Sequence, residues 1–137
     1  MYRILVPVDT NESRAMRQVE FVTSLPDAAD AVEVILQFVY HGEAQDAPDE
    51  VRAVASARRI ESVRTAMDRL EEAGVEFVVV EESGDTAQDI IDRGDEDDVD
   101  LIVLGGRKRS PAGKVIFGSV TQSVLLNTDR PVTVTGG

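Results

Sequence analysis

The chain has 137 residues, 42% of them apolar and 29% charged, which fits a single domain over 1–137 and excludes global disorder. Its apolar runs cover only a few residues, far short of the roughly 20 that a membrane-crossing helix needs, so we expect no membrane span. The N-terminus turns acidic at Asp9, too early for a signal peptide, and a cytoplasmic protein is expected. Without cysteine and with one histidine, the chain has no disulfide, thiolate zinc site or multi-histidine metal site.

The charge is strongly negative and unevenly distributed. The chain has 26 acidic and 14 basic residues, for a net charge of −12, which disfavours a nucleic-acid partner. The acidic run 95–98 lacks the ligand spacing of a calcium loop and is interpreted as a solvated helix end. Residues 105–128 differ from the rest because they contain no acid but carry Arg107, Lys108, Arg109 and Lys114. This segment predicts a local anion-binding site.

Hydrophobic periodicity predicts five strands alternating with four helices. In chain order these are a strand over 2–8, a helix over 12–25, a strand over 32–40, a helix along the apolar stripe from Ala53 to Leu70, a strand over 75–80, a helix opening at 84–86, a strand over 99–104, a helix over 119–127 and a strand over 131–135. Asn11 or Ser13 is expected to cap the first helix, and Gly74 to end the second. Apolar strands separated by helices indicate a parallel sheet covered on both faces, a doubly wound α/β fold.

Ligands of such sheets bind beyond the carboxyl ends of the strands, where the strand order reverses. The first strand ends near Asp9 and the fourth near Gly105, and a helix is predicted to start at Gly118 and Ser119. Glycines allow close approach of an anion to the backbone, and a helix N-terminus directs unpaired N–H groups at it. The glycine spacing is equally compatible with a phosphate site and with an ordinary turn.

Four stretches together resemble the universal stress protein family along the whole chain. They are Ile4 to Asp9, Leu101 to Arg107, Gly118 to Thr121 and Asp129 to Val134. The resemblance implies an adenine nucleotide alpha hydrolase-like fold, with a five-stranded parallel sheet of order 3-2-1-4-5. This fold agrees with the element count obtained from periodicity.

The ATP-binding branch of that family carries G-x-x-G, then nine residues, then glycine followed by Ser or Thr. Gly105, Gly118 and Ser119 match this motif, but Lys108 stands at the second glycine. A side chain there can fill the space of the phosphates, whereas its charge can attract them. Two functions follow: an ATP-binding regulatory stress protein, which we favour, and a nucleotide-free dimeric interaction module.

The resemblance also implies roles for individual residues. Asp9 would accept hydrogen bonds from the ribose hydroxyls, the Val39 backbone would meet the adenine edge, and the motif residues would hold the phosphates. The implied nucleotide-binding residues are Pro7, Asp9, Val39, Gly105, Arg107, Lys108, Gly118, Ser119 and Val120. Asp9 and Ser119 could instead serve only as helix or turn caps.

ATP is the implied ligand, and Mg²⁺ can arrive with its phosphates and use few protein ligands. No nucleophile and base stand at a recognisable spacing, so we predict no catalytic residue and at most slow hydrolysis. We also expect a homodimer through the C-terminal strand 131–135, which the implied order places at a sheet edge and which carries no charge after Arg130.

Overall fold

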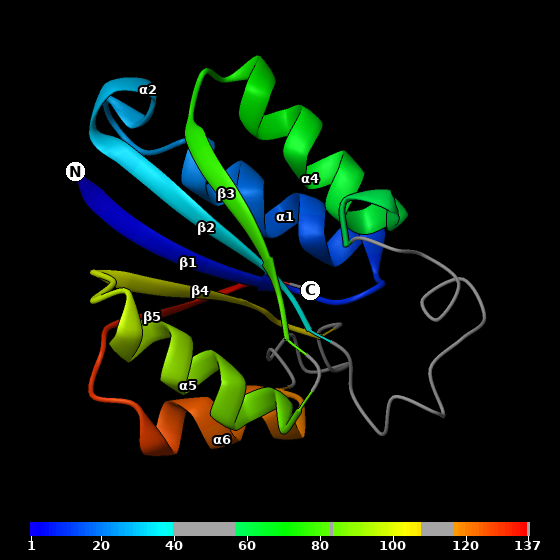
Figure 1. Ribbon diagram of the computed structural model, residues 1–137, viewed down its shortest axis with the longest axis vertical. Coiled ribbons are helices and arrows are strands. Elements are labelled where there is room, and N and C mark those ends of the chain that lie inside the picture. Colours follow the sequence, from blue (N-terminus) through cyan, green and yellow to red (C-terminus); the bar gives the residue numbers. More distant parts are fainter. Residues whose placement is uncertain (40–56, 83, 108–116, 137) are drawn as a thin grey trace.

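The computed structural model describes residues 1–39, 57–82, 84–107 and 117–136, and its centre is one parallel sheet (Figure 1). The strands are β1 (Tyr2–Val8), β2 (Val32–Phe38), β3 (Glu76–Glu81), β4 (Leu101–Gly105) and β5 (Val132–Thr135). Their order is β3-β2-β1-β4-β5, and every neighbouring pair is parallel. The doubly wound fold and its strand order are therefore confirmed.

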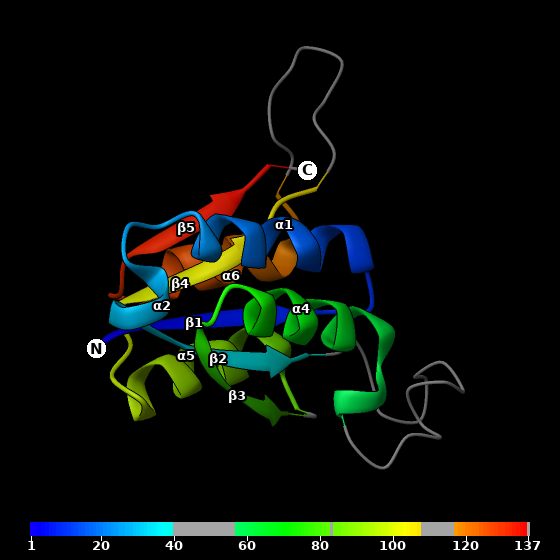
Figure 2. The ribbon, with the colours of Figure 1, turned by 90° about the horizontal axis from the view of Figure 1, so that it is seen from above.

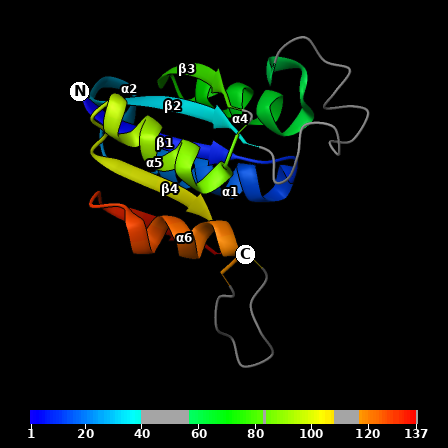
Figure 3. The ribbon, with the colours of Figure 1, turned by 60° about the horizontal axis from the view of Figure 1, so that its bottom comes forward.

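Helices cover both faces of this sheet. On one face lie α1 (Glu12–Thr23) and α4 (Glu61–Glu72), and on the other lie α5 (Thr86–Glu96) and α6 (Ser119–Asn127), as Figures 2 and 3 show. The central strands are apolar on both sides for this reason. Ile4, Val6 and Val8 of β1 join the core under α1 and α4, whereas Leu5 joins the core under α5 and α6.

The predicted helix along the stripe from Ala53 to Leu70 differs from the structure. Residues 53–56 lie outside the described residues, and the described part is divided into a 3-10 turn, η2 (Ala57–Arg59), and α4. Ile60 separates the two with extended backbone angles, φ −75° and ψ 133°. Its side chain is nevertheless buried, so the stripe points inward on both sides of the break. The spacing of apolar residues indicates which face of this segment is buried, but it does not indicate the break at Ile60.

A second difference is the short helix α2 (Ala28–Ala31), which raises the number of described α-helices from the predicted four to five. It follows Asp27, whose backbone adopts the left-handed conformation with φ 55°. Four residues are too few to show a helical apolar period, so the sequence pattern contained no signal for it. Within the described residues, no helix has the length and hydropathy needed to cross a bilayer.

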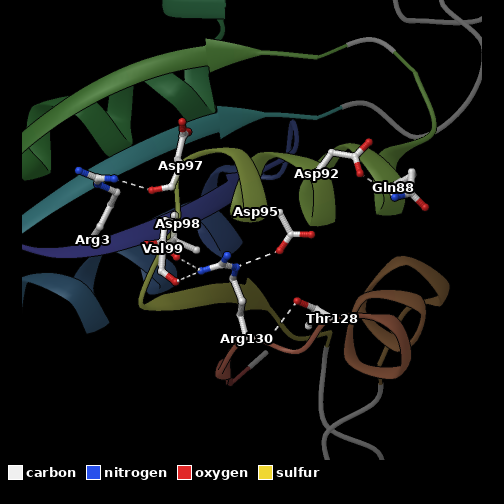
Figure 4. Close-up of polar contacts among 9 residues, drawn as sticks. All are labelled: Arg3, Gln88, Asp92, Asp95, Asp97, Asp98, Val99, Thr128 and Arg130. Carbon is white, nitrogen blue, oxygen red and sulfur yellow. Dashed lines mark hydrogen bonds and ion pairs between the residues drawn. The ribbon is translucent and has the colours of Figure 1, made fainter.

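Arg130 lies just before β5 and contacts the segment that leads into β4 (Figure 4). Its Nε lies 3.0 Å from Asp95 Oδ1, its Nη1 lies 3.0 Å from Asp98 Oδ1, and Nη1 also donates to the Val99 carbonyl at 2.8 Å. The run 95–98 thus forms the end of α5 and the following turn, with two of its carboxylates paired to an arginine. The hydrogen bonds that Arg130 donates to Asp95 and Asp98 raise its pKa.

Candidate functional site

The strand order reverses between β1 and β4. The chain passes from β1 to β2 and β3 on one side, then returns through α5 to β4 and β5 on the other. The β1–β2 register extends over seven residue pairs, from Tyr2 to Val8, whereas the β1–β4 register contains only Ile4 with Leu101 and Leu5 with Ile102. A short ladder of this kind leaves a crevice at the carboxyl ends of β1 and β4, where the general rule for such sheets places the ligand.

Pro7 explains why the β1–β4 ladder stops. Arg3 accepts a backbone hydrogen bond from Asp100 next to β4, and Val8 accepts one from Val39 beyond β2. Because alternate residues of a strand face opposite neighbours, Pro7 faces β4 like Arg3. Proline has no N–H to donate, so the ladder loses a bond at this position.

Gln18 of α1 bridges the two strands where their ladder has ended. Its buried Nε2 donates to the Pro7 carbonyl at 2.6 Å and to the Val103 carbonyl at 3.0 Å. Both carbonyls are therefore satisfied while the strands stay apart. Sequence reasoning missed Gln18, although a single polar residue beside the apolar face of Ala15, Val19 and Val22 was a detectable signal.

A cavity of about 50 Å³ opens into this crevice. Of the nine predicted site residues, Lys108 lies outside the described residues, Ser119 does not line the cavity, and the remaining seven do: Pro7, Asp9, Val39, Gly105, Arg107, Gly118 and Val120. They come from four separate regions of the chain, and the fold brings them together. Arg14 and Gln18 line the same cavity and were not predicted.

Several hydrogen bonds fix Asp9 in place. Its Oδ1 accepts from the Asn11 N–H at 2.9 Å, its Oδ2 accepts from Arg14 Nη1 at 2.6 Å, and its carbonyl accepts from Ser62 Oγ at 2.6 Å. Asp9 therefore closes the turn before α1, as the alternative interpretation held, and it also lines the cavity. The α1 cap itself is Asn11, whose side chain accepts from the Arg14 N–H. Ser62, on α4, was not predicted.

Two arginine side chains occupy the space beside the two motif glycines. A β-carbon on Gly105 would lie 2.3 Å from Arg14 Cγ and 2.5 Å from Cδ, and one on Gly118 would lie 2.7 Å from Arg107 Nε. A side chain at Gly105 would require Arg14 to shift, and one at Gly118 would displace the end of the Arg107 side chain. The backbone of Gly118 is extended, with φ −75°, so the constraint there is space rather than conformation.

The start of α6 also corrects a predicted cap. Gly118 is the N-cap residue and Ser119 is the first residue of the helix, so Ser119 does not have the N-cap role proposed as its alternative. Gly118 has no side chain that could cap the N–H groups of the first turn, and no side-chain cap is present. Such groups suit an anion, because they carry the positive end of the helix dipole.

The cavity lining has an apolar part and a charged part. Val39, Ile90 and Val120 supply apolar surface, while Asp9, Arg14 and Arg107 supply charge. This combination suits a ligand with a flat apolar ring system and an anionic group. Among the described residues, no three His, Cys, Asp or Glu side chains are grouped closely enough to hold a metal ion.

Comparison with known proteins supplies the family. The family model described as "Universal stress protein family" matches residues 1–136. A curated universal stress protein of Mycolicibacterium smegmatis is 38% identical over 64 residues, and the match spans 46% of this chain and about half, 49%, of that protein.

Two solved structures from Archaeoglobus fulgidus extend the comparison to the whole fold. A universal stress protein matches with a TM-score of 0.74 and 30% identity, covering 98% of each chain. A second structure, of the universal stress protein in complex with dAMP, matches with a TM-score of 0.70 and 25% identity over 98% of each chain. With the family match over nearly the full length and the expected fold around a crevice at the strand ends, the chain belongs to the universal stress protein family.

Proposed function

We propose that this chain is a cytoplasmic regulatory protein that binds an adenine nucleotide, expected to be ATP, in the crevice between β1 and β4. The observation that carries the proposal is the convergence of seven predicted nucleotide-binding residues on one cavity. They were selected by their likeness to a family motif, and only folding brings β1, the end of β2, the end of β4 and the start of α6 together. The dAMP complex of the Archaeoglobus fulgidus relative supports the same class of ligand.

Each part of the nucleotide has a matching part of the lining. The apolar side chains of Val39, Ile90 and Val120 suit the adenine ring, and Asp9 suits the ribose hydroxyls. Gly118 and Arg107 lie beside the uncapped start of α6, where the phosphates would gain N–H donors and a cation.

Binding requires the arginine side chains to move. The cavity of about 50 Å³ holds a few water molecules, whereas pockets for small ligands usually measure about 300–1,000 Å³. Arg14 and Arg107 fill the space next to the glycines, and both are long side chains with several rotatable bonds. We expect the nucleotide to displace them from these positions without a change in the sheet.

The described residues that line the cavity offer few protein ligands for a metal ion. Asp9 is the one carboxylate residue among the described residues that line the cavity, and it is already paired with Arg14. Mg²⁺ would therefore be held mainly by the phosphates of the ligand and by water. We assign no catalytic residue.

Calorimetric titration of the purified chain with ATP, with and without Mg²⁺, tests the proposal. Mass spectrometry of the natively purified protein shows in addition whether an adenine nucleotide accompanies it. We expect saturable binding with one nucleotide per chain. Absence of binding by ATP, ADP and AMP at millimolar concentration would favour the nucleotide-free dimeric module. In that case Lys108→Gly, which restores the family spacing, should restore ATP binding.

The homodimer is proposed on the geometry of β5. This strand pairs with β4 on one side, and no described strand lies on its other side. Pro131 accepts a backbone hydrogen bond from Ile102 of β4, and Thr135 accepts one from Gly106 directly after β4. By alternation, position 134 directs its N–H away from β4, toward the free edge, where a second copy could pair with it.

Val134→Pro removes that outward donor without removing a bond to β4. We expect the dimer dissociation constant to rise about tenfold or more, since a two-fold axis repeats each lost hydrogen bond. Val134→Ala is the control because it shortens the side chain but keeps the N–H. Sedimentation at high salt, which screens the net charge of −12, measures both variants. A parent protein that stays monomeric under these conditions contradicts the dimer.

A further inference from the structure

Arg14 occupies an electrostatically unfavourable position for a cation. It is the third residue of α1, where the positive end of the helix dipole disfavours positive charge. Its ion pair with Asp9, at 2.6 Å, offsets this cost, and its aliphatic stem lies against Gly105. Both side chains of the pair are about one-fifth exposed, 21% for Arg14 and 19% for Asp9, and both residues line the cavity.

Arg107 reaches the same cavity from a different element. It follows β4, and its guanidinium group lies beside Gly118 at the start of α6. Among the described residues that line the cavity, Arg14 and Arg107 are the cations and Asp9 is the anion, so the lining carries one net positive charge. The whole chain carries −12, and this crevice is therefore a local exception to its surface charge.

We propose that Arg14 is a phosphate-recognition residue, and that Arg14 with Arg107 makes the site select phosphorylated adenine ligands over adenosine. This inference rests on the proposed function and names the specificity of that same site. A guanidinium group has five N–H donors in a planar fork that matches phosphate oxygens, and the hydrogen bond to Asp9 uses one of them. Arg14 also neutralises Asp9, whose carboxylate would otherwise repel a phosphate in the same crevice.

The variants Arg14→Gln and Arg17→Gln test this proposal as a matched pair. Both remove one positive charge from α1, but Arg17 is exposed and does not line the cavity. Each variant and the parent are titrated with adenosine, AMP and pyrophosphate at several salt concentrations, after circular dichroism has established that the variants are folded. Arg14→Lys is included because it keeps the charge but loses the planar fork.

We expect Arg14→Gln to bind AMP about 10- to 100-fold more weakly, while its adenosine affinity changes by about twofold or less. The dependence of AMP affinity on salt should become shallower, and Arg14→Lys should keep most of that dependence. Arg17→Gln should behave as the parent does. Equal losses for AMP and adenosine, a gain in AMP affinity, or equal effects of the Arg14 and Arg17 variants would each overturn the proposal.

The ligand set separates this inference from the proposed function. If the parent binds pyrophosphate in an Arg14-dependent manner but neither adenosine nor AMP, adenine recognition is wrong and anion recognition by Arg14 stands. If the parent binds adenosine and AMP equally, adenine recognition stands and the phosphate selectivity is wrong. If none of the three ligands binds, both proposals fail.

Discussion

The arginines beside the amino-terminal ends of β1 and β5 differ in their contacts from the arginines that line the crevice. At the amino-terminal end, Arg130 contacts Asp95, Asp98 and the Val99 carbonyl, and the Arg3 side chain donates to Glu33 and to the Asp97 carbonyl. Each guanidinium group there joins segments that are far apart in the chain. At the carboxyl-terminal end, Arg14 and Arg107 lie against glycines, and Asp9, which pairs with Arg14, is the one carboxylate residue among the described residues lining the cavity.

This difference separates a structural role from a ligand-binding role within one residue type. Arginines whose donors face carboxylates and carbonyls of the same chain hold turns in place. Arginines that lie against glycines at the strand ends have further N–H groups that can donate to an external anion. Arginine substitutions at the amino-terminal end should therefore change stability and leave affinity intact, and substitutions of the arginines that line the crevice should mainly change affinity.

The largest expected effect is that of Gly118→Val on binding. The β-branched side chain would occupy the place of the Arg107 guanidinium and cover the start of α6. Because the Gly118 backbone angles suit any residue, the fold should persist while ATP affinity falls about 100-fold or more. Calorimetry measures the affinity, and circular dichroism checks the fold.

Gly84→Val is the matched control, because Gly84 also lies just before a helix but does not line the cavity. It should bind ATP as the parent does. A Gly118→Val variant that binds ATP with parental affinity would show that the phosphates lie elsewhere. An unfolded variant would instead make Gly118 a purely structural glycine.

The next largest expected effect is that of Gln18→Leu on the free energy of unfolding. Gln18→Leu leaves the Pro7 and Val103 carbonyls without the amide that now bridges them. Unpaired buried carbonyls cost about 1–3 kcal/mol in the free energy of unfolding, which urea denaturation measures. Gln18→Glu, which cannot donate from an ionised carboxylate, should be at least as destabilising. Parental stability of both variants would show that the strands do not need this bridge.

Much of the fold could be predicted because apolar residues repeat with regular periods. The alternation of strands and helices needs only local patterns, and burial on both faces of β1 and β2 follows from their continuous apolar runs. The strand order came from family resemblance rather than from periodicity. Ile60 and α2 could not be predicted, since a one-residue break and a four-residue helix do not alter an apolar period.

The site was predictable only where a family motif names its residues. Glycine and Asp positions at strand ends are readable from sequence, and seven of the predicted site residues line one cavity. That these residues bind a nucleotide stays a prediction. Arg14 could not be distinguished from the exposed Arg17 on the same helix, because its partners Asp9 and Gly105 become neighbours only after folding. Whether Lys108 joins them stays a prediction, since it lies outside the described residues.

The smallest expected effect is that of Arg130→Gln at the amino-terminal end. The carboxylates it contacts are largely exposed, 62% for Asp95 and 88% for Asp98, so solvent weakens these ion pairs and the loss should be about 0.5–1 kcal/mol. Since those carboxylates raise the pKa of Arg130, its stabilising charge is complete below its unfolded-state pKa and is lost only at strongly alkaline pH. The difference between parent and variant should therefore stay constant from about pH 6 to 9 and shrink with added salt. Urea denaturation at several pH values and salt concentrations measures this difference in unfolding free energy, and the ATP affinity of the variant should equal that of the parent.

Arg107→Gln is the counterpart at the other end of the sheet, for which we expect weaker ATP binding and unchanged stability. If Arg130→Gln weakened ATP binding as much as Arg107→Gln did, the division of arginine roles between the two ends of the sheet would be wrong.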